Sequence, residues 1–225
     1  MDEEQQRDRI QNQVAKSGAG GAFQGGGTLF TEPILVVNQK TKIIELTNEY
    51  TVFDADGNRV GGVRQVGQST AKKLLRALTS IDQFLTHRLE VTDANGTPVM
   101  AVTRPAKILK STVVVENTNG GELGRIIQEN AIGKIRFRME SGGVVVGMLK
   151  AENWRAWNFA ITDGSDQEVA RITKTFEGIA RTLFTTADHY VVHVHRQLQE
   201  PLRSLVVAAA LCVDTALKQD SRGLG

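Results

Sequence analysis

Alternating apolar residues broken by clusters of turn-forming residues recur along most of the chain, and this pattern constrains the fold more than any other feature. Asp-Gly and Asn-Gly pairs supply the positive φ angles that a tight turn between antiparallel strands requires. Several such hairpins at short spacing predict an all-β sandwich or barrel. The four clearest hairpins are residues 50–63, 89–102, 113–126 and 159–172, and a fifth, residues 134–149, turns at Ser141–Gly143.

The length and the first residues of the chain suggest one folded domain behind a tail. With 225 residues the chain can bury a sizeable core in a single domain. The glycine-rich stretch Ser17–Gly27 cannot bury enough apolar surface to offset its ordering entropy, so residues 1–27 are predicted to be a disordered tail and residues 28–220 the folded domain. No apolar run follows Met1, and the single cysteine, Cys212, excludes an intramolecular disulfide. Both features predict a cytoplasmic protein.

A C-terminal apolar segment breaks the β pattern and predicts a helix over residues 202–218, with Pro201 suited to its first turn. Leu205–Val213 is apolar without interruption, so a helix there must be buried in protein or in lipid. The whole helix would span about 25 Å and its apolar part about 14 Å, against roughly 30 Å for a bilayer core. We therefore predict a buried core helix, which the alanines at 208–210 make slim enough to fit between strands.

A second break in the β pattern lies at residues 69–85. Its apolar residues at 74, 75, 78, 81 and 85 are spaced as on one face of a helix. The other side carries Lys72, Lys73 and Arg76. An amphipathic helix lying on the barrel is the favoured interpretation, and a basic amphipathic helix that touches a membrane is the alternative.

An antiparallel β-array followed by one apolar C-terminal helix resembles the phospholipid scramblase family and the related tubby C-terminal-like (LURP-one-related) proteins. The resemblance covers residues 28–218 and is carried by Leu89–Pro105, which ends in Arg-Pro, and by the closing segment 186–217. It implies a mainly β fold with one helix: a closed antiparallel barrel of about twelve strands around a central apolar helix. It also implies a role at phospholipid surfaces, since family members are associated with calcium-triggered lipid scrambling or with phosphoinositide binding.

The stretch that matches the family's calcium-binding segment lies just before the terminal helix. Here it keeps Asp188 but continues with histidines and apolar residues. Calcium takes roughly six to eight oxygen ligands, largely from carboxylates and carbonyls, so one aspartate is too few. We expect no calcium dependence and no other cofactor.

The net charge is only +2, but the positive charge is concentrated in residues 104–155, which hold nine basic and five acidic side chains. Within this segment, the alternation of a strand would place Lys134, Arg136 and Arg138 in a row on one face. Arginine can bind phosphate through two parallel hydrogen bonds, so the row is a candidate lipid-headgroup site. The candidates expected to join it are Lys107 and Lys110 from a neighbouring strand, and Lys72, Lys73 and Arg76. The alternative is an outward strand face charged only for solubility.

Histidines near the C-terminus raise the question of a metal site. His193 and His195 would share one strand face, with Asp188 and His189 close by. Zinc requires three or four protein ligands and supporting hydrogen bonds, and the one further histidine, His87, is distant in sequence. A polar strand face is therefore favoured over a metal centre.

The sequence favours a non-enzymatic protein, because it contains no nucleophile elbow, zinc-binding helix or paired-carboxylate motif. The slight net charge and an aromatic content of 5% disfavour nucleic-acid binding. The predicted function is docking on an anionic phospholipid surface at the inner face of a membrane. The alternative is a structural or protein-interaction module with a protein partner and no lipid role. True lipid scrambling is less favoured because Asp214 shortens an already short apolar helix. The oligomeric state is left open.

Overall fold

The computed structural model describes residues 3–39, 50–66, 87–105, 111–130, 133–152, 158–175 and 189–220. The predicted helix at 69–85 lies outside these described residues. The two described helices are α1 (Glu3–Ser17) and α3 (Leu202–Asp220). The strands are β1 (Ile34–Gln39), β2 (Tyr50–Phe53), β3 (Arg59–Val66), β4 (His87–Asp93), β5 (Pro98–Arg104), β6 (Thr112–Asn117), β7 (Glu122–Gln128), β8 (Arg136–Ser141), β9 (Val144–Ala151), β10 (Asn158–Asp163), β11 (Glu168–Thr175) and β12 (His189–Val194).

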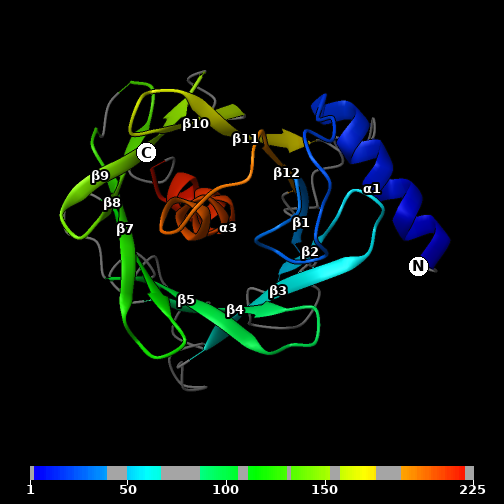
Figure 1. The fold of residues 1–225 in the computed structure, drawn as a ribbon, viewed down its shortest axis with the longest axis horizontal. Coiled ribbons are helices and arrows are strands. Elements are labelled where there is room, and N and C mark those ends of the chain that lie inside the picture. The colour runs from blue at the N-terminus through cyan, green and yellow to red at the C-terminus, as the bar shows by residue number, and fades with distance from the viewer. Residues whose placement is uncertain are drawn as a thin grey trace.

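The strands form one closed barrel in which each strand pairs antiparallel with its neighbours in sequence. Closure comes from β1, which pairs with β2 on one side and with β12 on the other, so that Val36 lies opposite both Phe53 and Val191. Helix α3 occupies the centre of the barrel (Figure 1). The predicted fold, a closed antiparallel barrel around an apolar C-terminal helix, is confirmed.

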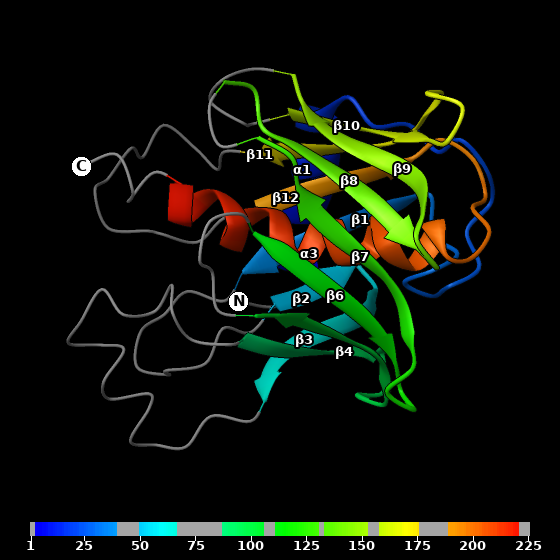
Figure 2. The ribbon, with the colours of Figure 1, turned by 90° about the vertical axis from the view of Figure 1, so that its left-hand side faces the viewer.

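All five predicted hairpins are present, and their turns lie at the end of the barrel where α3 begins (Figure 2). Four of the turns use the same device. In the β2–β3 turn, Oδ1 of Asp54 accepts the backbone N–H groups of Asp56 and Asn58 at 3.0 and 2.8 Å. Asp93, Asn117 and Asp163 accept the equivalent pairs in their own turns. The side chain that begins each of these turns therefore stabilises it through bonds to backbone N–H groups two and four residues later.

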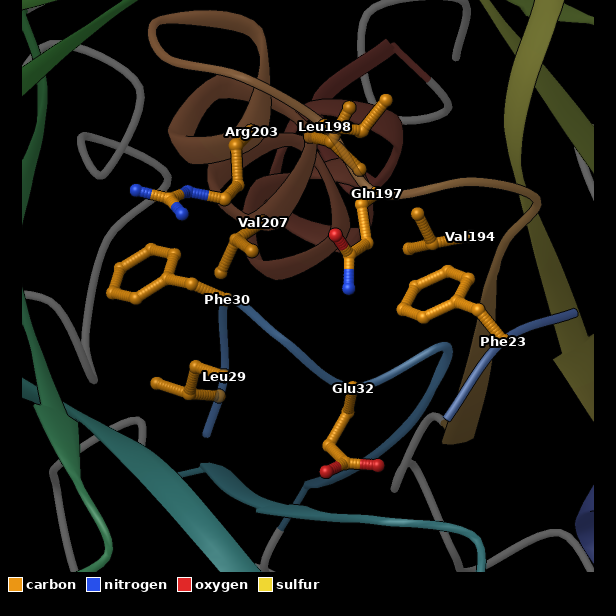
Figure 3. A pocket seen from close by; sticks show the side chains of 10 residues that line it. Phe23, Leu29, Phe30, Glu32, Val194, Gln197, Leu198, Arg203 and Val207 are labelled. Atoms are coloured by element: carbon orange, nitrogen blue, oxygen red, sulfur yellow. The ribbon is translucent and has the colours of Figure 1, made fainter. Parts of the chain in front are cut away.

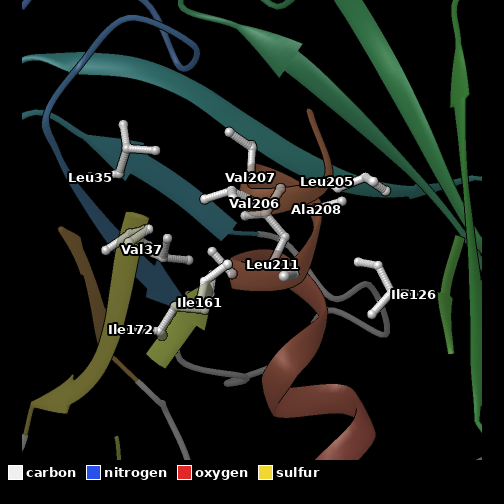
Figure 4. Close-up of a cluster of buried hydrophobic side chains, with 14 of the residues drawn as sticks. Leu35, Val37, Ile126, Ile161, Ile172, Leu205, Val206, Val207, Ala208 and Leu211 are labelled. Carbon is white, nitrogen blue, oxygen red and sulfur yellow. The ribbon is translucent and has the colours of Figure 1, made fainter. Parts of the chain in front are cut away.

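The interior of the barrel is filled by α3. Leu205 and Ala208 are 0% exposed and Leu211 is 2% exposed, and they pack against inward residues such as Ile126 and Ile161 (Figure 4). The prediction of a buried core helix is confirmed. Neither described helix is long and apolar enough to cross a membrane.

Glycine at position 147 allows α3 to approach the wall closely. A Cβ there would lie 2.6 Å from the carbonyl oxygen of Thr162 and 3.0 Å from Cδ1 of Leu202. The carbonyl belongs to the backbone of β10 and cannot move cheaply. A larger residue at this point would push β9 away from β10 or from the helix.

We expect Gly147→Ala to lower the free energy of unfolding by about 1–3 kcal/mol, because it overpacks the contact between β9, β10 and α3. Urea unfolding followed by circular dichroism measures the change. Gly164→Ala is the matched control: its Cβ would meet nothing closer than the Val145 carbonyl oxygen at 3.7 Å, so a change within about 0.5 kcal/mol is expected. Equal effects of the two substitutions would contradict the packing argument.

Residues 1–27 were predicted to be a disordered tail, but Glu3–Ser17 forms helix α1. The helix covers the outside of the barrel at its closure (Figure 1). Ile10 is 0% exposed and lies in a second apolar cluster with Ile34, Val36, Phe53 and Val191, against which Val14 also packs. The entropy argument holds for a glycine-rich stretch, but residues 3–17 contain neither glycine nor proline and carry two apolar residues four positions apart.

Hydrogen bonds add to this contact. An N–H of the Arg9 guanidinium donates to Nε2 of His189 at 2.8 Å, and Nδ1–H of the same ring donates to Asn38 on β1 at 2.9 Å. His189 is 6% exposed. The N-terminal helix is thus joined to β12 and β1, the two strands that close the barrel.

Candidate functional site

Strand β8 places its cations on the outside of the barrel. Phe137 and Met139 are 3% and 0% exposed and point into the core, whereas Arg136 is exposed and Arg138 is half-exposed on the outer face. Lys134 lies in the bend that leads into the strand and is also exposed. Arg136 and Arg138 of the predicted row therefore share the outer face of β8, and Lys134 is exposed in the bend directly before the strand.

Of the three cations, Arg138 is neutralised by a carboxylate, whereas Lys134 and Arg136 are not. Nε of Arg138 lies 2.5 Å from Oε1 of Glu140, which is two positions along the same face. Lys134 and Arg136 form no ion pair within the described residues. Arginines elsewhere on the outer surface resemble Arg138 and have carboxylate partners: Arg64–Glu90, Arg88–Glu116, Arg125–Glu122, Arg171–Glu168, Arg196–Asp163 and Arg203–Glu200.

In the described part of the chain, Arg7 and Arg59 also have no ion pair. Their surroundings differ from those of the β8 cations. Arg7 lies on α1, whose first turn carries Glu3 and Glu4, and Arg59 directly follows a turn that contains two aspartates. Acidic neighbours weaken the attraction of these two arginines for an anionic surface.

The strand next to β8 adds positive charge at the same place. Arg136 lies directly opposite Lys150 of β9. Like charges in directly opposed positions destabilise a sheet. The ammonium of Lys150 contacts the carboxylate of Asp166, which offsets part of this repulsion. On the other side, the backbone N–H of Glu129 donates to the carbonyl oxygen of Arg136 at 2.9 Å, so an acidic residue is the neighbour of Arg136 on the β7 side.

Asn130 positions the two unpaired cations and was missed in the sequence analysis. Its side-chain amide donates to the carbonyl oxygen of Lys134 at 2.8 Å, and its Oδ1 accepts the backbone N–H of Arg136 at 2.9 Å. The bend before β8 therefore has a fixed backbone on both sides of Ile135. Asparagine commonly makes such local bonds to the backbone in turns, but a partner four to six residues away is not evident from the sequence.

The other candidate cations, Lys72, Lys73, Arg76, Lys107 and Lys110, lie outside the described residues, as does Asp188. The strand that follows Lys110 lies next to β7, because the backbone N–H of Gln128 donates to the carbonyl oxygen of Ser111 at 2.9 Å. This contact is at the same end of the barrel as the bend at Lys134. The remaining candidates are neither confirmed nor contradicted.

The two candidate metal-binding histidines lie together, but in an ion-pair network. The rings of His193 and His195 meet edge to face with centroids 4.5 Å apart, and Nε2 of His195 lies 3.1 Å from Oε1 of Glu168. That glutamate also binds Arg171, whose cation would repel a metal ion. In the part of the chain that the structure describes, no group of three histidine, cysteine, aspartate or glutamate side chains is arranged to hold a metal.

Burial and the neighbouring His195 lower the pKa of His193, which is therefore neutral near pH 7. Burial acts to raise the pKa of Glu168, but hydrogen bonds from Arg171 and His195 outweigh it, and the pKa is lowered below its usual 4.5. Both shifts fit a folded network that keeps Glu168 ionised.

Glu168→Gln should therefore lower the free energy of unfolding by about 1 kcal/mol at neutral pH, where the ionised carboxylate has its partners. A carboxyl group with a lowered pKa in the folded state stabilises above its unfolded pKa, and this contribution is lost as the pH falls through the folded pKa. The difference between wild type and variant should be constant above about pH 5.5 and shrink below about pH 4.5. Urea unfolding across this range measures it, and a difference that grows on acidification would contradict the assignment.

A pocket lies between residues 23–32 and the start of α3, at the end of the barrel opposite to the one that carries Lys134 (Figure 3). The guanidinium of Arg203 lies 5.6 Å from the centre of the Phe30 ring. The charged residues that line the pocket already have partners, since Glu32 accepts the backbone N–H of Gly27 at 2.6 Å and Arg203 pairs with Glu200 at 2.7 Å. This pocket is therefore a weaker candidate for an anionic ligand than the end of β8.

Comparison with known families agrees with the fold. A family model described as Scramblase matches residues 27–217, which is most of the chain. The chain belongs to the scramblase family. The match includes every strand of the barrel and most of α3, whereas α1 precedes it. The scramblase-family barrel and its N-terminal helix are therefore distinct parts of the chain.

Two curated relatives of this chain are distant in sequence and longer. A phospholipid scramblase family protein of Schizosaccharomyces pombe is 21% identical over 196 residues, covering 80% of this chain and 50% of that protein. Altered inheritance rate of mitochondria protein 25 of Saccharomyces cerevisiae is 22% identical over 202 residues, covering 76% of this chain and 61% of that protein. This chain thus spans only about half to three fifths of their lengths. An X-ray structure of an Arabidopsis thaliana protein aligns at 15% identity with a TM-score of 0.47, covering 84% of this chain and 99% of that one.

Proposed function

We propose that this protein docks on anionic phospholipid surfaces through the outer end of β8, without carrying out a chemical reaction. The observation that supports this most directly is the pair Lys134 and Arg136, which are exposed and have no ion pair within the described residues. Membership of the scramblase family and the name of the fission-yeast relative support phospholipid as the anionic partner. Docking of this kind needs no catalytic group and no cofactor.

The charges predict which residues contribute to binding. A cation close to an anionic leaflet gains about 1 kcal/mol, provided that it is not already neutralised. Lys134 and Arg136 meet this condition, and Lys150 raises the local positive potential. Arg138 must share its charge with Glu140 and should contribute less. The site would place the barrel against the cytoplasmic face of a membrane while α3 stays in the core.

Replacing both unpaired cations, in Lys134→Gln/Arg136→Gln, should weaken partitioning onto anionic vesicles about 30-fold, since two contributions of about 1 kcal/mol are lost. Flotation with vesicles containing 30 mol% phosphatidylserine measures the change. Thermal stability should be unchanged because both side chains are exposed. Arg138→Gln alone should weaken binding less than either single replacement at 134 or 136.

The matched control is Arg7→Gln/Arg59→Gln, which removes the same net charge from two other exposed, unpaired arginines. We expect this control to weaken vesicle partitioning less than about threefold. Salt screens charges that lie farther from the membrane than about 10 Å, so a change in net charge away from the contact has little effect. Equal losses in the two double variants would contradict the site. Absence of wild-type binding to anionic vesicles would contradict the function and favour a protein-interaction module.

Salt and calcium test the nature of the binding. Attraction between exposed charges should fall steeply as the salt concentration rises from 0.05 to 0.5 M, because the screening length shortens severalfold. We expect the same binding in calcium as in chelator, since the stretch just before β12 and α3 supplies a single aspartate, Asp188, too few for a calcium site. Binding only in the presence of calcium would contradict direct docking by the cations.

A further inference from the structure

The tip of the β8–β9 hairpin exposes apolar side chains. Val144 is 64% exposed and Val145 is 45% exposed, and these are the large hydrophobic residues that the described part of the chain leaves most open to solvent. The residues at the turn itself, Gly142 and Gly143, have φ angles of 57° and 81° and no side chains. No charged residue occurs from Ser141 to Leu149.

The tip stays exposed on its β9 side because it extends beyond the pairing of β9 with β10. Strand β9 pairs with β8 as far as Ser141↔Val144, but its pairing with β10 ends at Gly147↔Asp163. The tip is nevertheless held in place, since Oγ of Ser141 donates to the carbonyl oxygen of Leu123 at 2.7 Å. A pre-ordered apolar tip loses little conformational entropy when it is buried.

The size of the exposed patch decides between a protein and a bilayer as the partner. A stable protein–protein contact buries roughly 800 Å² on each partner, far more than two partly exposed valines can provide. Reversible insertion into the outer layer of a membrane needs no such area, because charge attraction on the same hairpin can supply the rest. Arg136, on the outer face of β8, and Lys134, exposed in the bend before it, lie at the other end of this hairpin and complement an anionic headgroup layer.

We propose that Val144 and Val145 insert into the interfacial layer of an anionic bilayer while Lys134 and Arg136 contact its headgroups. The β8–β9 hairpin then lies along the membrane plane, with its wall of the barrel facing the lipid. This inference rests on the proposed function and adds the orientation and the apolar contact. Between the two contact points, Met148 is half-buried and uncharged, and the carboxylate of Glu140, which lies opposite Val145, is neutralised by its ion pair with Arg138.

An environment-sensitive probe at the tip tests the orientation. Val144→Cys is labelled with a nitrobenzoxadiazole fluorophore in a Cys212→Ala background, and the control label is placed at Asn95→Cys. Asn95 is exposed in the β4–β5 turn, at the same end of the barrel but on a different wall. On addition of anionic vesicles, emission from position 144 should rise about threefold or more and shift to the blue, while position 95 should not respond.

Three other results would overturn the inference. No response at 144 while the protein still floats with vesicles means that the cations bind without the tip. Equal responses at 144 and 95 mean that the barrel contacts the membrane with the end that carries its hairpin turns, and not with the β8–β9 wall. Absence of flotation for the unlabelled wild type overturns the proposed function together with the inference.

Substitution of the tip gives an independent measurement. Val144→Thr/Val145→Thr keeps the shape and β-branching but makes the tip polar, so vesicle partitioning should weaken roughly tenfold. The dependence on salt should keep its slope, because no charge is changed, whereas Lys134→Gln/Arg136→Gln should flatten it. Unchanged partitioning of the threonine variant in a protein with wild-type thermal stability would contradict insertion.

Discussion

The burial of α3 inside the barrel is the constraint on which the rest of the structure depends. A barrel of this size needs material in its lumen, and Leu205–Leu211 supplies a surface that is apolar all round. Because the helix fills the interior, inward side chains on every wall are committed to packing. Closure through β1 and β12 also removes the strand edges at which other chains could pair. Any function must then be displayed on the outer faces, the turns or the ends of the barrel.

The outer faces are mostly neutral at close range, because most described arginines pair with a nearby carboxylate on the same strand, such as Arg125 with Glu122, or on another strand, such as Arg64 with Glu90. The outer end of β8 departs from this pattern: Lys134 and Arg136 lack such partners within the described residues, and Lys150 lies opposite the second of them. Concentrating like charge in this way costs stability and is favourable when an anion balances it. Docking by this wall leaves the core intact. Extracting α3 into a membrane would instead empty the lumen and expose the inward faces of the strands.

Local chemistry explains how much of this could be predicted. The hairpins follow from turn residues a few positions apart, and α3 follows from the length of one apolar run. Alternation along a strand predicts that Arg136 and Arg138 share a face, and the same rule places Glu140 beside Arg138. The opposition of Arg136 and Lys150 depends on the register between strands, and the bonds of Asn130 depend on the path of a bend; neither is encoded in a short window. Helix α1 could have been predicted from the spacing of Ile10 and Val14. The glycine-rich stretch 17–27 dominates the composition of residues 1–27, however, and led to the prediction that the whole segment is disordered.

The central claim is that the barrel binds as an intact body, with α3 retained as its core. Hydrogen exchange of the backbone amides of residues 205–211, measured by mass spectrometry with and without anionic vesicles, tests it most directly. We predict that these amides exchange only through global unfolding and keep their protection, within about twofold, when the protein is bound. Loss of protection in this helix on vesicle binding, while the strands stay protected, would show that α3 leaves the barrel and would contradict the account.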